Sequence, residues 1–373
     1  MEKFSLATAI YSGNDSLERL GLLKGETIFL VCDAFLPDTP TLKKILGEID
    51  SSNQVTIFAD VKPDPPLANI IAGVKQFAPV APTVMIGIGG GSAIDTAKGI
   101  RFFGDKLRKT GIKKFIAIPT TSGTGSEITQ HCVLSDPENH RKYPIMEDFL
   151  RPDEALLDPQ LVMTAPKSVT AYSGLDVLTH SLESLVAVDA NMITDGLAEK
   201  GVDVITHDLV TCYRHGEDEA ARKRVHEISC AAGIAFSNAG LGICHSLAHQ
   251  LGANFHVPHG LANAMLLPYV VAYNAEHDKV ACAKYAQAAR KAGLAANGMG
   301  DTVAVHRLIN CIRQMMLKMD CPRTLQAFGV EIKDAVDMTD TIVANARLDA
   351  TFPGNPVVPT DADLAKIYQQ VIK

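Results

Sequence analysis

Features that would mark a nucleic-acid-binding, membrane or disulfide-rich protein are missing from this sequence. Basic residues are not in excess, because 42 Asp and Glu outnumber 35 Lys and Arg, which does not favour nucleic acid or anionic lipid. No apolar run approaches the roughly 18 residues of a membrane-spanning helix. The eight cysteines are scattered without a C-x-x-C pair, as expected for reduced thiols in the cytoplasm. We therefore expect a cytoplasmic enzyme with a small, diffusible substrate and no nucleic acid or membrane partner.

The first half of the 373-residue chain alternates β-rich runs with helical patterns. This pattern predicts βαβ units and a mostly parallel sheet, that is, an α/β domain, which we assign to residues 1–167. A chain of this length accommodates a second domain of ordinary size. The predicted strands are 26–33, 54–60, 82–89 and 113–120, with helices at 38–50 and 65–77.

The second half has a different spacing of apolar residues. Apolar residues recur at spacings of three and four through 168–188, 195–213, 218–240 and 305–319. That period predicts amphipathic helices, and no convincing strand interrupts them, so we expect an all-α domain over 168–373. Two domains that meet directly leave a cleft, and small ligands bind preferentially in such clefts.

A glycine run, "IGIGGGSAIDTAKGI" (86–100), follows a predicted strand and opens a helix. Gly89, Gly90 and Gly91 leave no side chain between the backbone and a bulky anion, and Ser92 can cap the helix. The positive end of the helix dipole then faces the anion. A tight turn alone would not need so many glycines. The run therefore indicates a phosphate-binding loop, although it matches neither G-x-G-x-x-G nor a P-loop.

Two further features lie at the same predicted edge of the sheet. Asp33 ends the first predicted strand, where a carboxylate can bind both hydroxyls of an adenosine ribose and repel a 2′-phosphate. The loop "IPTTSGTGSEIT" (118–129) crowds hydroxyls and glycines after another strand. Together with the glycine run, these features predict a dinucleotide site. The hydroxyl-bearing candidates in the loop are Thr120, Thr121, Thr124 and Ser126.

Four of the 12 histidines lie in one stretch, "GICHSLAHQLGANFHVPHG" (242–260). His245 is one helical turn from His249, and Asp176 and His180 repeat this spacing on another predicted helix. With His259, which follows a proline in a predicted turn, Asp176, His180 and His245 would form a site of three imidazoles and one carboxylate. Such a set suits Fe(II) or Zn(II), and the absence of thiolates argues against a zinc finger or an iron–sulfur cluster.

The other histidines require separate interpretations. His249 would lie close to the metal yet remain free to exchange protons near neutral pH, which suits a proton relay. Three interpretations of His256 stay open: a substitute ligand, a substrate contact, or a residue without a role in the site. We interpret the remaining histidines as incidental: His131, His140, His207, His215, His226, His277 and His306.

The sequence resembles the iron-dependent (group III) alcohol dehydrogenases along essentially its whole length. The resemblance is carried by "GIGGGSAIDTAK", "AIPTTSGTGSE", "GLDVLTHSLES" and the long segment "AAGIAFSNAGLGICHSLAHQLGANFHVPHGLANAMLLP". The last is highly specific, whereas the glycine run alone would not be. Within the family, the sequence looks most like the propanol and ethanol dehydrogenases of propanediol and ethanolamine utilisation.

The resemblance implies a Rossmann-like N-terminal domain and an all-helical metal domain, the architecture that dehydroquinate synthase also has. Asp176, His180, His245 and His259 take the four ligand positions of the family, and His249 takes the relay position. The implied metal is Fe(2+), with Zn(2+) as the alternative.

The resemblance also implies roles in binding NAD(H). Gly89, Gly90, Gly91 and Ser92 match the pyrophosphate positions, and Asp33 matches the ribose selector. The other matched positions lie on the adenine and ribose side or near the nicotinamide: Thr120, Thr121, Asp95 and Lys142.

The expected activity is the metal-dependent, NAD(H)-linked interconversion of a short-chain primary alcohol and its aldehyde. Two alternatives stay open: a zinc-dependent glycerol or polyol dehydrogenase, and a lyase like dehydroquinate synthase. The lyase would need a cluster of basic residues to hold an anionic substrate, and 242–260 has none. The resemblance further leads us to expect a homodimer or higher homo-oligomer, with packaging in a bacterial microcompartment as a plausible location.

Overall fold

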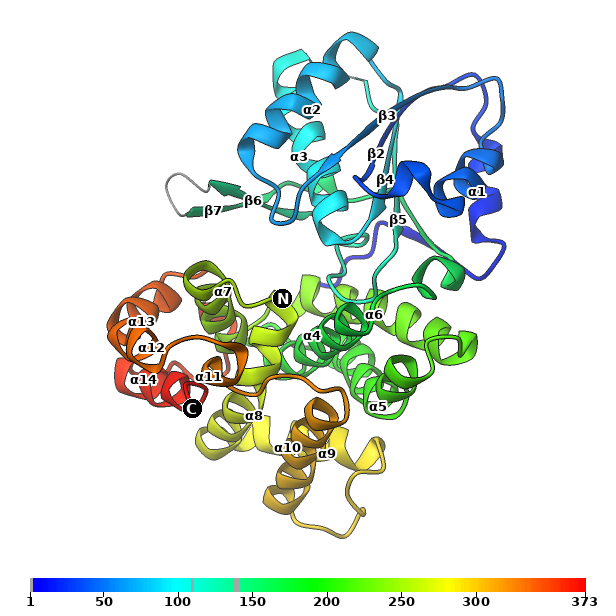
Figure 1. Ribbon diagram of the computed structural model, residues 1–373. Coiled ribbons are helices and arrows are strands. Elements are labelled where there is room, and N and C mark those ends of the chain that lie inside the picture. Colours follow the sequence, from blue (N-terminus) through cyan, green and yellow to red (C-terminus); the bar gives the residue numbers. More distant parts are fainter. Residues whose placement is uncertain (1–2, 109–110, 137–140) are drawn as a thin grey trace. The chain divides into compact units, whose positions relative to one another are not determined.

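The computed structural model describes residues 3–108, 111–136 and 141–373. The chain divides into two compact units. We call Leu6–Ala165 the α/β unit, and Pro166–Lys373 with the start of the chain up to Ser5 the helical unit. Figure 1 shows the elements of both.

A parallel six-stranded sheet forms the centre of the α/β unit, with the strand order β1-β8-β5-β4-β2-β3. A separate antiparallel hairpin of β6 and β7 follows the fifth strand in sequence. The strands are β1 (Ala9–Ser12), β2 (Thr27–Asp33), β3 (Gln54–Val61), β4 (Val84–Gly89), β5 (Lys114–Pro119), β6 (His131–Asp136), β7 (Arg141–Met146) and β8 (Glu154–Leu157).

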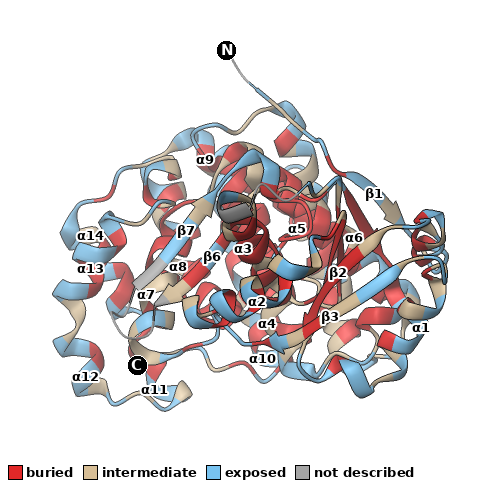
Figure 2. Ribbon diagram, turned by 90° about the horizontal axis from the view of Figure 1, so that it is seen from above, coloured by how far each residue is buried: buried red, intermediate tan, exposed pale blue. Residues whose placement is uncertain are grey.

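Both faces of the central strand β2 are buried. Successive side chains of a strand point to opposite sides, and each side of β2 belongs to a different core. Ile28 and Leu30 of β2 belong to a core that includes residues of α1, whereas Phe29 and Val31 belong to a second core with α2 and α3. Figure 2 shows the resulting continuous burial of β2. The helical elements of this unit are η1 (Ser16–Leu22), η2 (Leu36–Asp38), α1 (Pro40–Glu48), α2 (Leu67–Val80), α3 (Gly91–Arg108), η3 (Asp148–Leu150) and η4 (Pro159–Val162).

The order of the strands creates a switch point between β2 and β4. From β2 the chain crosses to β3 on one side and then returns to β4 on the other side of β2. The loops that leave the carboxyl ends of β2 and β4 therefore diverge, and nucleotides bind in such a crevice in open α/β sheets. Asp33 and the glycine run are the residues at these two ends.

The helical unit contains no strand among its described residues. Its core is one large apolar cluster to which most of its helices contribute. No single helix of the described ranges has the length and apolarity of a membrane span; α6 and α7, which are bent by 109°, pass that test only as a pair. The elements are α4 (Lys167–Val186), α5 (Met192–Arg214), α6 (Glu219–Ala239), α7 (Ile243–Phe255), α8 (His259–His277), α9 (Lys279–Lys291), α10 (Asp301–Lys318), α11 (Leu325–Phe328), α12 (Ile332–Asp337), α13 (Thr339–Arg347), η5 (Phe352–Gly354) and α14 (Asp361–Gln369).

The predicted fold class is confirmed: a parallel α/β unit is followed by an all-helical one. All four predicted strands form, with bounds that shift by at most two residues. The sequence patterns do not predict β1, β8 or the β6–β7 hairpin. Strands of four residues, such as β1 and β8, are too short to show a clear alternation, and only their pairing in the sheet stabilises them.

Candidate metal centre and nucleotide loop

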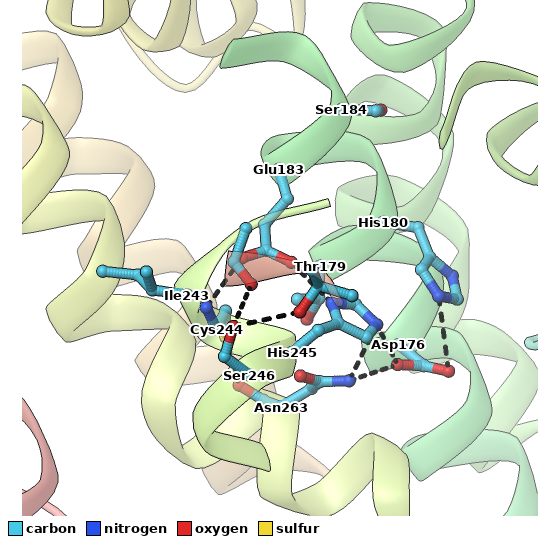
Figure 3. Close-up of polar contacts among 12 residues, drawn as sticks. Asp176, Thr179, His180, Glu183, Ser184, Ile243, Cys244, His245, Ser246 and Asn263 are labelled. Atoms are coloured by element: carbon cyan, nitrogen blue, oxygen red, sulfur yellow. Dashed lines mark hydrogen bonds and ion pairs between the residues drawn. The ribbon is translucent and has the colours of Figure 1, made fainter. Parts of the chain in front are cut away.

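One face of α4 carries three ionisable residues at successive turns: Asp176, His180 and Glu183. Their spacing of four and then three residues places them above one another on a helix. All three are buried at 4% exposure or less. Buried polar side chains need partners, and α7 and α8 supply those of Glu183 and Asp176 (Figure 3). Nδ1 of His180 is buried without a hydrogen-bond partner among the described residues.

Glu183 binds the start of α7. Its Oε1 accepts the backbone N–H of Cys244 at 2.7 Å, and its Oε2 is 2.5 Å from Nδ1 of His245. A carboxylate at the N-terminus of a helix satisfies N–H groups that lack an intrahelical partner. Burial raises the pKa of Glu183 to about 7. In its ionised form Glu183 accepts the Nδ1–H of His245, which leaves the Nε2 lone pair facing Asp176. A carboxylate behind a ligating imidazole is the usual support of a metal-bound histidine.

The close approach of α8 to α4 depends on Gly260. A Cβ at this position would lie 2.1 Å from the backbone oxygen of Tyr172 and 3.2 Å from Cβ of Asp176. Only a residue without a side chain fits there. The preceding residue, His259, thereby comes close to α4, and its Nε2 lies 3.6 Å from Oδ1 of Asp176.

Three of the four predicted ligands form a cluster around Asp176, and the fourth, His259, approaches the same carboxylate. Nε2 of His245 is 3.8 Å from Oδ1 of Asp176, and Nε2 of His180 is 3.9 Å from Oδ2. The ligand atoms of Asp176, His180 and His245 all lie within 4.8 Å of one another. These separations are too long for hydrogen bonds, but tetrahedral bonds of about 2.1 Å would place neighbouring ligand atoms about 3.4 Å apart. The donor set therefore fits a divalent metal.

Burial and neighbouring groups keep His245 and Asp176 in the protonation states that bind a cation. Burial, together with the neighbouring His180 and His259, holds the pKa of His245 well below its ordinary value, so its imidazole is neutral. Burial alone would raise the pKa of Asp176, but its three imidazole neighbours and the Asn263 amide outweigh it and lower the pKa. A neutral His245 imidazole and an ionised Asp176 carboxylate are the protonation states that metal binding requires.

Asn263 lies one helical turn after His259 and connects the ligands. Its Nδ2 donates to Oδ1 of Asp176 at 2.7 Å and lies 3.2 Å from Nε2 of both His245 and His259. An amide N–H that donates to the carboxylate restricts the orientation of this ligand, as outer partners of metal ligands commonly do.

His249 packs beside the ligands. Its ring stacks on that of His259 at a centroid distance of 5.4 Å and meets His245 edge-on at 6.0 Å. Its Nδ1 is 2.8 Å from Oδ2 of Asp349, a residue between α13 and η5. The ring therefore lies next to the cluster while its Nδ1 is committed to a carboxylate.

His256 does not join the cluster. It is the C-cap of α7, with an exposed side chain and a left-handed backbone at φ 56°. Histidine is among the few non-glycine residues that adopt this conformation with some frequency. The left-handed backbone at the end of α7 therefore explains why a histidine is tolerated at this position.

The glycine run and Asp33 meet at the switch point of the sheet. Gly89 has φ +143°, and a Cβ there would lie 2.4 Å from Oδ2 of Asp33 and 2.6 Å from Cβ of Ala93. The same carboxylate oxygen accepts the backbone N–H of Gly90 at 3.3 Å. Burial raises the pKa of Asp33, and the Gly90 N–H opposes this shift. The carboxylate thus lies directly beside the loop expected to hold the pyrophosphate.

The hydroxyl-rich loop packs against the same glycines. A Cβ on Gly91 would lie 2.7 Å from Cγ2 of Thr124, and one on Gly90 would lie 3.5 Å from Oγ1 of Thr121. The backbone N–H of Thr120 donates to the oxygen of Gly89 at 2.9 Å. The structure therefore brings the loop that follows β5 to the start of α3, where Ser92 lies in the first turn.

A buried lysine that the sequence analysis did not single out holds this loop. Nζ of Lys98, on α3, lies 2.6 Å from the backbone oxygen of Ser126, 3.1 Å from Oγ1 of Thr129 and 2.8 Å from the backbone oxygen of His131. Burial lowers the pKa of Lys98. A desolvated ammonium needs several acceptors, and these acceptors belong to one stretch of chain, so Lys98 anchors that stretch to α3.

Asp95 takes part in the same anchoring. Its Oδ1 accepts the hydroxyl of Ser126 at 2.6 Å, and its Oδ2 accepts the backbone N–H of Val133 at 3.0 Å. The predicted contacts of Asp95 and Ser126 with the cofactor stay predictions; their side chains already have partners within the protein. The remaining cofactor candidate, Lys142, is the second residue of β7. Its side chain lies outside the described residues.

Three supporting residues of the metal cluster were missed, for different reasons. Glu183 could have been found, because it continues the spacing of Asp176 and His180 on α4. Asn263 follows His259 by one turn, but an asparagine on an apolar helix carries no specific signal. Asp349 is 100 residues from His249 in sequence, so only folding brings the two together.

The chain is similar to known proteins along its whole length. A model of iron-containing alcohol dehydrogenases matches residues 7–159, and one of the C-terminal part of the Fe-containing alcohol dehydrogenase family matches 170–372. The chain is 41% identical to 1-propanol dehydrogenase PduQ of Citrobacter freundii, with all of both chains covered. It is 36% identical to an NADPH-dependent butanol dehydrogenase of Clostridium saccharobutylicum, over 100% of this chain and 98% of that one. Alcohol dehydrogenase from Oenococcus oeni superposes with a TM-score of 0.92 at 29% identity, with all of both chains covered.

Proposed function

Because the chain belongs to the iron-containing alcohol dehydrogenase family, we propose that it interconverts a short-chain primary alcohol and its aldehyde with NAD(H). The observation that carries this proposal is the cluster of Asp176, His180 and His245, whose ligand atoms lie within 4.8 Å of one another, with Nε2 of His259 3.6 Å from Oδ1 of Asp176. Relatives named for 1-propanol and butanol support a short-chain substrate.

The metal would be held by these four side chains, from α4, α7 and the start of α8. A divalent metal supplies Lewis-acid polarisation of the substrate oxygen, and a nicotinamide dinucleotide supplies or accepts the hydride. Three imidazoles and a carboxylate suit Fe(2+) as well as Zn(2+), and we propose Fe(2+) from the family.

The protein residues prepare this chemistry in several ways. Glu183 keeps Nε2 of His245 unprotonated, and Asn263 orients the carboxylate of Asp176. His249, whose ring lies against His259, would relay the proton of the reaction through its Nε2. We assign His249 as a proton relay and not as a metal ligand.

The dinucleotide would bind at the switch point of the parallel sheet. Gly89, Gly90, Gly91 and Ser92 would receive the pyrophosphate, since backbone N–H groups at a helix N-terminus favour an anion. Asp33 would accept hydrogen bonds from the ribose hydroxyls. The hydroxyls of Thr120, Thr121 and Thr124, with Lys142, are proposed as further contacts.

A homo-oligomeric state and packaging in a bacterial microcompartment, inside the cytoplasm, remain proposals that follow from the resemblance to PduQ. Size-exclusion chromatography with light scattering tests the first of these.

The decisive experiment combines metal analysis with a substrate panel. Protein purified without oxygen should contain about one iron per chain and should reduce propanal and acetaldehyde with NADH. His259→Ala, at a half-exposed position, should lose metal and activity together while remaining folded, because it removes one of the four ligands. His245→Ala is expected to behave in the same way.

The matched control is His256→Ala, which changes an exposed histidine three residues before His259. It should keep full metal content. If His259→Ala retained its metal, the ligand assignment would be wrong. If the wild type bound metal but reduced no aldehyde in the panel, the proposed activity would be wrong.

A further inference from the structure

We propose that Asp349 is a positioning residue that sets the tautomer of His249. This inference rests on the proposed function, because His249 is its proton relay. Oδ2 of Asp349 lies 2.8 Å from Nδ1 of His249, and the carboxylate side chain is 15% exposed. An ionised carboxylate can only accept, so Nδ1 must carry the proton.

The charge state of Asp349 agrees with this arrangement. Burial would raise its pKa, but the hydrogen bond from His249 and the contacts with Thr351 outweigh burial and lower it. The carboxylate therefore stays ionised near neutral pH, and the proton stays on Nδ1 of His249. Nε2 is then the nitrogen whose lone pair is available for exchange.

The other carboxylate oxygen is held by a fixed pair of donors. Oδ1 of Asp349 accepts the backbone N–H of Thr351 at 2.9 Å and its hydroxyl at 2.8 Å. Oγ1 of Thr351 also lies 3.0 Å from Oγ of Ser246, which precedes His249 by one turn of α7. The segment after α13 is thus bound to the helix that carries His249, and Oδ2 is the oxygen that remains for the imidazole.

This pair of donors makes the carboxylate testable by an isosteric change. In Asp349→Asn, the amide oxygen would stay on the two donors of Thr351, because an NH₂ group cannot accept them. The amide nitrogen would then face Nδ1 of His249 and donate to it. That hydrogen bond requires Nδ1 to be unprotonated and moves the proton to Nε2. In this tautomer Nε2 has no free lone pair and cannot accept a further proton.

We expect Asp349→Asn to lower kcat more than Asp349→Ala does. A purely structural role of Asp349 would give the reverse order. Asp349→Asn should lower kcat by about 10²-fold, as expected when a positioned acid–base group is lost, with KM and metal content unchanged. Asp349→Ala leaves both tautomers accessible and should lower kcat less. Thermal stability should follow the opposite order, since Ala loses more hydrogen bonds than Asn.

Three further measurements complete the test. In a His249→Ala background, neither change at Asp349 should lower kcat further. Asp337→Asn, an exposed acid on α12, serves as the matched control and should leave kcat unchanged. NMR of ¹⁵N-labelled, zinc-loaded protein should show His249 protonated at Nδ1 in the wild type and at Nε2 in Asp349→Asn.

The outcomes separate this inference from the proposed function. If the wild type catalyses no alcohol oxidation, the proposed function fails, and the NMR tautomer still decides the role of Asp349. If the Ala variant is slower than the Asn variant, or if the His249 tautomer is the same in wild type and Asp349→Asn, Asp349 does not set the tautomer and the inference is overturned.

Discussion

The carboxylate of Asp33 lies where β2 ends and the glycine run begins, in contact with the N–H of Gly90. A 2′-phosphate brought to this position would meet a negative charge at close range. No basic residue follows Asp33 until Lys43, so the adjoining segment offers no compensating charge. Repulsion by an unpaired like charge is one way in which a site rejects a competing ligand.

Replacement of Asp33 by Gly should therefore change the choice of cofactor. We expect kcat/KM with NADPH to rise relative to NADH by at least about tenfold, since like-charge repulsion at such a site costs several kcal/mol. Metal content should not change. Asp38→Ala, an exposed acid in η2, is the matched control and should leave the ratio unaltered.

The contrary outcome is informative, because one relative is named as NADPH-dependent. A wild type that prefers NADPH, or a ratio that does not move in Asp33→Gly, would show that Asp33 only supports the turn after β2.

At the level of helices, the metal cluster depends on how closely α8 approaches α4. A Cβ on Gly260 would lie 2.1 Å from the backbone oxygen of Tyr172, which cannot yield as a flexible side chain could. Gly260→Ala must therefore displace the start of α8. We expect it to weaken metal binding by at least about tenfold and to cost about 1–3 kcal/mol of unfolding free energy, as measured by chelator competition and thermal unfolding.

Gly196→Ala on α5 is the matched control, because nothing lies within 4 Å of the added Cβ. It should leave metal affinity unchanged and stabilise the helix by up to about 1 kcal/mol. Equal metal affinity in the two variants would mean that helix spacing does not control the cluster.

For the whole chain, we expect metal to stabilise the helical unit selectively. The four ligands come from α4, α7 and α8, all in that unit, and a ligand bound only by the folded state at 100 times its Kd stabilises it by about 2.7 kcal/mol. Removal of the metal by a chelator should speed hydrogen exchange in these helices.

The internal control is the parallel sheet of the same molecule. Exchange in β2, β4 and β5 should not change, and added metal should restore protection in the helices. Equal loss of protection in both units would contradict a metal site confined to the helical unit.

Much of this molecule can be predicted from the sequence because the relevant patterns are local. Short β-rich apolar runs between helical segments predict β2 to β5, and spacings of three and four predict the long helices. The same spacing determines that Asp176 and His180 share a face of α4, and that His245 and His249 share a face of α7. The glycine run and Asp33 can be interpreted because each adjoins the end of a predicted strand.

Only the tertiary structure decided which faces meet. Contact between α4, α7 and α8 arises from packing of their apolar sides in one core and from the close approach that Gly260 permits. Lys98 became the anchor of the 126–131 segment because folding places a buried ammonium beside its acceptors. Asp349 reaches His249 across 100 residues of sequence. No local periodicity encodes such pairs, since the free energy that brings them together comes from burying the surfaces around them.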